Sequence, residues 1–84
     1  MKFRSNWVGM HLINGKVSAT FDGGSFTHSK TSLKKEIAQS VMNFLGQGLS
    51  KIHAERLFAT GRLNLQDEYG NVHTWAVIKA DARV

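Results

Sequence analysis

The chain has 84 residues, contains neither cysteine nor proline, and carries a formal net charge of +5. A chain this short fits a single domain, residues 1–84, around one small core, and the lack of cysteine excludes a disulfide scaffold or a thiolate metal site. No stretch approaches the ~20 apolar residues of a membrane-spanning helix, and no leader sequence is recognisable, so we expect a cytoplasmic protein.

The positive charge is concentrated in the first part of the chain. Residues 1–35 contain six Lys or Arg and one Asp, whereas residues 36–84 contain five residues of each sign. This asymmetry is typical of a protein with an anionic partner, although surplus lysines also serve solubility. Both interpretations stay open at this point.

A β-hairpin is predicted at the start of the chain, from residues 7–13 and 16–21. Asn14-Gly15 separates the two strands and is typical of a two-residue type I′ turn. Alternation in both strands predicts one shared apolar face, which consists of Val8, Met10, Leu12, Val17, Ala19 and Phe21.

The longest predicted element is a helix over Ser32–Leu45, with Ser32 as its N-cap. Gly46 and Gly48 follow it, and either can adopt the left-handed conformation that ends a helix. Its apolar face is expected to pack on the sheet and consists of Leu33, Ile37, Val41, Phe44 and Leu45.

Residues 49–60 fit two structures. Ser50 could cap a short helix with Ile52, Arg56 and Ala59 on one face, whereas the end of this stretch could also form a strand. We favour the helix because no β-branched residue occurs between Ile52 and residue 59.

A second hairpin is predicted from residues 62–66 and 72–80, with a turn around Gly70 and Asn71, and residues 81–84 are expected to fray. Two hairpins with a helix between them predict an α+β fold. The expected architecture is a two-layer sandwich, in which an antiparallel sheet carries the main helix on one face, in the order ββα(α)ββ.

This fold leaves the second face of the sheet uncovered. The candidates for that face are Trp7, His11 and Trp75, together with His73. An exposed aromatic face would bind a protein partner or, in a homodimer, a second copy of the chain.

The residues that lead into the main helix form a candidate anion-binding site, because residues 23–35 include no acid. A helix N-terminus presents free N–H groups and partial positive charge, so phosphates bind there readily. Lys34 and Lys35 are expected in the first turn, where they oppose the macrodipole, which favours a functional role. The alternative is that they are ordinary solvated lysines. The candidate residues are Ser29, Lys30, Lys34 and Lys35.

A second basic surface is predicted on the first hairpin, formed by Lys2, Arg4, Trp7 and Lys16. Aromatic side chains interleaved with cations bind single-stranded nucleic acid by stacking and charge. Alternatively, Trp7 belongs to the core and the terminal cations to a loose end of the chain.

The four histidines lack the spacing of a zinc site, and no paired carboxylates or nucleophile–base set can be assembled. His28 or His73 could serve a small ribonuclease as acid or base, but surface or strand histidines are the commoner explanation. We therefore expect no catalytic residue, no metal and no cofactor.

The size, the lack of proline and cysteine and the two-hairpin plan resemble the small accessory proteins of phages and mobile elements. This resemblance implies nucleic-acid binding or inhibition of a host protein. The sequence predicts a small basic binding module without enzymatic activity, whose partner is DNA or RNA. The alternative is a protein–protein interaction module that inhibits a host protein or nucleoprotein, and a small ribonuclease ranks third.

Overall fold

The computed structural model describes the backbone of residues 3–21 and 29–83 and the side chains of residues 7–21 and 29–79. Its elements in chain order are β1 (Phe3–Ile13), β2 (Lys16–Phe21), α1 (Lys30–Leu45), α2 (Lys51–Thr60), β3 (Arg62–Gln66) and β4 (Val72–Arg83). Within the described residues, neither helix combines the length and the apolar character that crossing a membrane requires.

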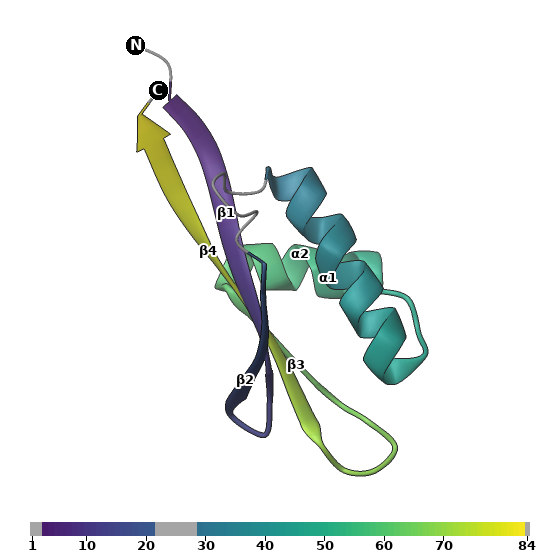
Figure 1. The fold of residues 1–84 in the computed structure, drawn as a ribbon. Helices are drawn as coiled ribbons and strands as arrows, with labels where there is room; N and C mark the ends of the chain where they lie inside the picture. Colours follow the sequence, from purple (N-terminus) through teal and green to yellow (C-terminus); the bar gives the residue numbers. More distant parts are fainter. Residues whose placement is uncertain (1–2, 22–28, 84) are drawn as a thin grey trace.

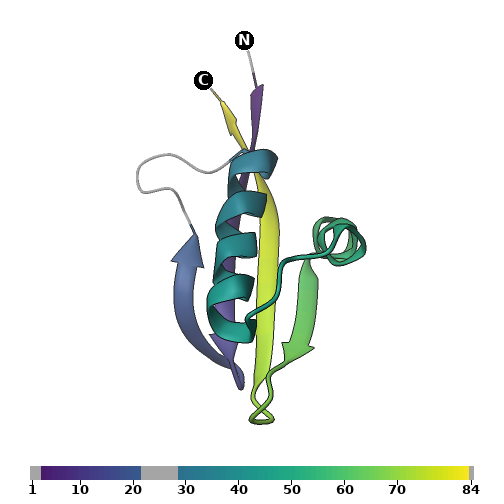
Figure 2. The same cartoon turned by 90° about the vertical axis from the view of Figure 1, so that its right-hand side faces the viewer.

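The four strands form one antiparallel sheet in the order β2-β1-β4-β3 (Figure 1). The long strands β1 and β4 lie at the centre and pair along their whole length, from Phe3 opposite Arg83 to Ile13 opposite His73. Both helices lie on the same side of the sheet, with α1 across β1 and β4 and α2 beside β3 (Figure 2). The predicted α+β sandwich of two hairpins and a main helix is therefore confirmed.

The core lies between the sheet and the two helices. Its fully or almost fully buried apolar residues are Leu33, Ile37, Val41, Leu57, Leu63, Trp75 and Val77. The indole Nε1 of Trp75 donates a hydrogen bond of 3.0 Å to Ser40 Oγ, so the one polar group of this large side chain is satisfied inside the core. The predicted apolar face of α1 is correct apart from Phe44, which is 45% exposed at the edge of the layer.

The helix α1 begins earlier than predicted. Ser29, rather than Ser32, is the N-cap, because the Ser29 hydroxyl accepts a hydrogen bond of 3.1 Å from the backbone N–H of Ser32. Lys30 is therefore the first helical residue, and the expectation that Lys34 and Lys35 occupy the first turn is wrong. They lie in the second turn, where the macrodipole has a smaller effect.

The helix α2 confirms the favoured structure of residues 49–60, and Ser50 caps it as predicted by accepting from the N–H of His53. The predicted packing face is wrong. Ala54 and Leu57 are buried, whereas Ile52 is 68% exposed. The reason is that Ala54, Leu57 and Phe58 form the apolar stripe at i, i+3 and i+4 that packs against the core.

The first hairpin has the predicted turn, since Asn14 and Gly15 both have the positive φ of a type I′ turn. The shared apolar face is only partly correct, because the pairing register shifts between His11 and Leu12. Val17 still lies opposite Leu12, but Ala19 pairs with His11 and Phe21 with Gly9. The bulge thereby turns the side chains of Ala19 and Phe21 toward the helices, while Thr20 lies on the opposite face.

The end of β4 also differs from its prediction as a frayed tail. Residues 81–83 pair with residues 3–5 of β1 and continue the central ladder, so the start of β1 and the end of β4 lie side by side (Figure 1). Val84 lies outside the described residues.

Candidate functional site

The aromatic residues predicted for the exposed sheet face lie on the opposite face. Trp75 and His11 have no exposed surface, and the Trp7 ring packs edge-on against Phe58 of α2 with centroids 5.0 Å apart. The expected exposure of His11 and Trp75 is therefore wrong, and Trp7, which is half-buried, lies on the helix side of the sheet. The helices cover this face because Gly9 lets α1 approach closely; a Cβ at that position would lie 3.2 Å from Leu33 Cδ1.

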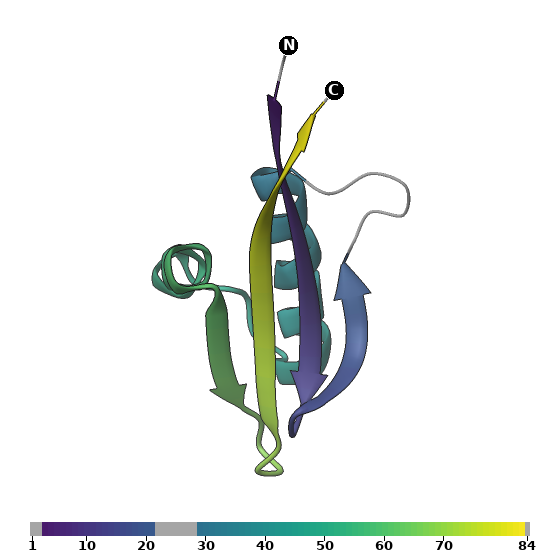
Figure 3. The same ribbon diagram turned by 90° about the vertical axis from the view of Figure 1, so that its left-hand side faces the viewer.

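Among the residues that the structure describes, no helix lies on the other face of the sheet (Figure 3). We define the open face by the side chains that the strand pairing places on it: Val8, Met10, Leu12, Val17, Thr20, Arg62, Asn64, Gln66, Val72, Thr74, Ala76 and Ile78. Two of them protrude, with Val17 60% exposed and Ile78 64% exposed. Since Val8 lies opposite Ile78 and Met10 opposite Ala76, the apolar groups form a continuous strip across β1 and β4.

A hollow of about 350 Å³ lies at the centre of the open face. It is lined by Val8, Gly9, Met10, Thr20, Ala76 and Ile78. Its floor is shallow because Gly9 and Ala76 contribute little or no side chain, whereas Met10 and Ile78 form its walls. Thr20 is the one lining residue with a polar side chain, so the hollow fits an apolar group of a partner.

The open face carries almost none of the charge of the molecule. Among the side chains that the structure describes, Arg62 of β3 is the one charged group on this side, where it lies opposite Ala76. Lys16 and Lys79 lie in strands but pair with Ile13 and Trp7, and therefore point to the helix side. Such a face is suited to an apolar protein surface and lacks the cations that a phosphate backbone requires.

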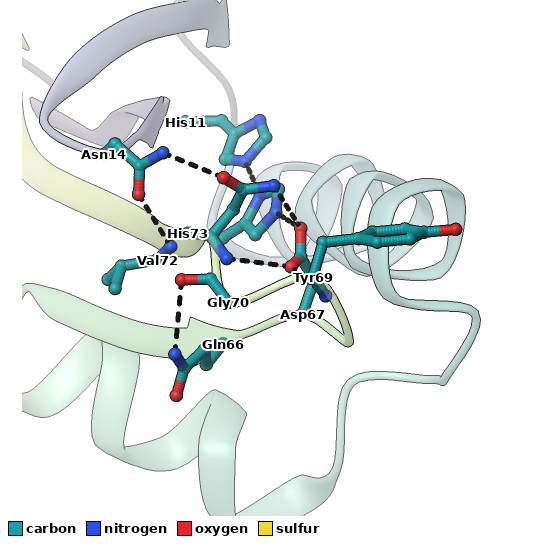
Figure 4. Close-up of polar contacts among 9 residues, drawn as sticks. His11, Asn14, Gln66, Asp67, Tyr69, Gly70, Val72 and His73 are labelled. Carbon is teal, nitrogen blue, oxygen red and sulfur yellow. Dashed lines mark hydrogen bonds and ion pairs between the residues drawn. The ribbon is translucent and has the colours of Figure 1, made fainter.

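A buried polar chain joins the two hairpins (Figure 4). His11 Nε2 lies 2.8 Å from His73 Nδ1, and His73 Nε2 lies 2.9 Å from Asp67 Oδ2. The carboxylate of Asp67 also accepts hydrogen bonds from the backbone N–H groups of Tyr69 and Asn71. It thus holds the β3–β4 turn and one end of the histidine pair at the same time.

The two hairpin turns are bonded to each other directly. Asn14 donates from Nδ2 to Asn71 Oδ1 at 3.0 Å, and its Oδ1 accepts from the N–H of Val72 at 2.9 Å (Figure 4). Asn14 N–H in turn donates to the carbonyl of Val72. The Asn-Gly turn therefore contributes to tertiary structure as well as to the hairpin.

In the polar chain of His11, His73 and Asp67, the proton positions depend on Asp67, which is the acceptor at its end. Hydrogen bonds from His73, Asn71 and Tyr69 lower the pKa of Asp67 to about 2, so Asp67 is an ionised acceptor. His73 donates from Nε2 to this carboxylate, and a single proton joins His11 Nε2 and His73 Nδ1, with the donor set by the tautomers of the two rings. Burial and the proximity of His73 lower the pKa of His11 to about 4, and His11 Nδ1 has no partner among the described atoms.

This arrangement is built for structure rather than for chemistry on a substrate. His73 is 2% exposed and both of its ring nitrogens are engaged, so it cannot contact an RNA phosphate as the ribonuclease expectation requires. His28, the other candidate, lies outside the described residues. No group of three or more potential ligands in the described part of the chain is placed to hold a metal ion.

The predicted anion-binding residues do not form one surface. Lys30, Lys34 and Lys35 are exposed on the first turns of α1, whereas Lys16 lies beside the β1–β2 turn, at the opposite end of the molecule (Figure 2). Lys2 and the side chain of Arg4 lie outside the described residues. Ser29 is occupied as the N-cap of α1.

The sequence did not lead to a prediction of the open face as a binding site. A signal was present in residues 72–78, where both alternating sets contain large apolar side chains, the set of Trp75 and Val77 and the set of Val72 and Ile78. A strand that is apolar on both faces indicates that both faces become covered.

Comparisons of the chain with protein-family models, with curated proteins and with solved structures found no match.

Proposed function

We propose that this protein is a non-enzymatic protein-interaction module that binds an apolar protein surface through its open face. The observation that carries the proposal is the continuous apolar strip with a central hollow on the side of the sheet that no helix covers. Burial of apolar surface contributes about 25 cal/mol per Å² to association, and Ile78 and Val17 offer most of their side chains for it.

The proposal is tested by capture on immobilised protein, with Ile78→Lys as the disruptive variant and Ile52→Lys as its control. Both isoleucines are exposed to a similar extent, 64% and 68%, but Ile52 lies on α2, away from the open face. We expect the wild type and Ile52→Lys to retain the same protein, after nuclease treatment as well, and Ile78→Lys to lose it. The proposal fails if both variants bind alike or if nuclease abolishes capture.

A second candidate function is nucleic-acid binding through α1. It is favoured by the lysines of this helix, because no described Lys or Arg side chain forms an ion pair with a described carboxylate and the first turn contains no acid. Lys34 and Lys35 therefore remain available to phosphates, whereas Lys30 Nζ lies over the Phe58 ring, 5.4 Å from its centroid.

This candidate predicts an affinity for DNA or RNA that decreases with salt, with a slope of about 0.9 per phosphate contacted on duplex DNA. Lys34→Glu combined with Lys35→Glu should abolish binding while the far-UV circular dichroism spectrum stays unchanged. Equal affinity of the double variant and the wild type, measured by fluorescence anisotropy, would eliminate α1 as the binding element.

A further inference from the structure

We infer that the occupant of the open face is a second copy of this chain, packed sheet against sheet in a two-fold symmetric dimer. This inference rests on the proposed function and names its partner. Two four-stranded sheets would form the centre of the dimer, and the helices of each copy would lie outside.

The first argument is shape. A two-fold interface uses the same patch on both subunits, so that patch must contain both protruding and receding parts. The open face has both: Ile78 and Val17 protrude, and the hollow between Met10 and Ala76 recedes. Side chains of one copy can therefore occupy the hollow of the other without a separate complementary surface.

The second argument is charge. Each chain carries a net charge of +5, so two copies repel unless their cations are kept apart. A pairing through the open face does so, because Lys30, Lys34 and Lys35 lie on α1, on the far side of the sheet. Arg62, the charged group on the described open face, lies on the edge strand β3, opposite Ala76 at the rim of the hollow.

The third argument is area. With a strand spacing of ~4.8 Å and a rise of ~3.3 Å per residue, the 26 strand residues whose side chains are described have a footprint of roughly 410 Å². Two such faces bury about 820 Å², below the ~1,000 Å² that a stable specific interface requires. The dimer is therefore expected to be weak and to dissociate on dilution.

The test is analytical ultracentrifugation of the full chain over a concentration series from about 1 to about 500 µM, the range in which an interface of this size dissociates. We expect the wild type and Ile52→Lys to change from 9.3 kDa to twice that mass as concentration rises. Ile78→Lys and Val17→Lys should each raise the dissociation constant about tenfold or more. Both positions are already exposed, so circular dichroism should show that these variants remain folded.

Three results would overturn the inference, and they differ in what they say about the proposed function. A wild type that stays monomeric, while Ile78→Lys abolishes capture of a different protein, excludes the second copy but keeps the protein-interaction surface. If the wild type is monomeric and no capture depends on Ile78, both the dimer and the proposed protein-interaction function are excluded. A dimer that persists unchanged in Ile78→Lys and Val17→Lys uses another surface.

Discussion

His11 is a buried imidazole that uses one ring nitrogen and leaves the other without a partner in the described part of the chain. Its ring stacks on Trp75 with centroids 4.5 Å apart and contacts Phe44 at the same distance. A buried polar atom without a hydrogen bond costs about 1–3 kcal/mol, so the aromatic contacts and the bond to His73 must offset that cost. A charged His11 would have no compensating partner, which explains why its pKa is low.

The first prediction concerns the pH dependence of stability. The pKa of His11 is about 4 in the folded chain against an ordinary value of 6.5, so the unfolded chain takes up a proton that the folded chain refuses. The stabilising contribution of the uncharged His11 is therefore complete above pH 6.5 and is lost as the pH falls toward 4. We expect the free energy of unfolding to decrease by about 3 kcal/mol across this window, measured by urea denaturation.

His11→Gln supplies the control for this experiment. The glutamine amide can donate to His73 Nδ1 but does not titrate, so the decrease should be much smaller in the variant. Equal slopes for the two proteins between pH 6.5 and 4 would show that His11 is not the group responsible.

At the scale of secondary-structure elements, the closest contact between layers is the crossing of α1 over β1. A Cβ at Gly9 would lie 3.2 Å from Leu33 Cδ1 and 3.2 Å from the carbonyl oxygen of Ala76. The glycine therefore sets the distance between helix and sheet, and any larger residue must separate them or displace backbone.

The second prediction follows from this contact. Gly9→Val should lower the free energy of unfolding by about 2 kcal/mol, as overpacking of a core generally does. Gly48→Val is the matched control, because nothing lies within 4 Å of a Cβ at Gly48 and its φ is not positive. Chemical denaturation that finds the two variants equally stable would contradict the role assigned to Gly9.

Local elements were predictable because their signals are local. The Asn14-Gly15 turn, the Ser50 cap of α2 and the i, i+4 series of α1 each lie within a few neighbouring residues. Ser29 and Ser32 could both cap a helix, so the three-residue error at the start of α1 reflects two equivalent signals rather than a missing one.

The candidate site was less predictable because it depends on packing between distant segments. The sequence correctly separates Trp7 and His11 from Val8 and Met10 as two faces of β1, but both sets are apolar enough to accept a helix. Gly9 packs against Leu33, which lies 24 positions later in the sequence, and no local pattern shows this contact. The bulge after His11 and the bond between His73 and His11 are long-range in the same sense.

For the whole molecule, the distribution of residue types over the two sides of the sheet is the main result. The helix side contains the core, the buried histidine chain and the exposed lysines of α1, whereas the described open side carries an apolar strip along β1 and β4 and a single charged side chain, Arg62. A two-layer fold with one apolar face uncovered gains stability when that face is covered by a protein partner.

The most direct measurement of this claim is a series of methyl-resolved NMR spectra recorded from dilute to concentrated protein. We predict that the methyl signals of Ile78, Val17 and Met10 shift together with concentration, while the signal of Ile52 stays constant, because the first three lie on the open face and the last on α2. Shifts that are absent from the open face, or that cluster on α1 and α2 instead, would contradict the account.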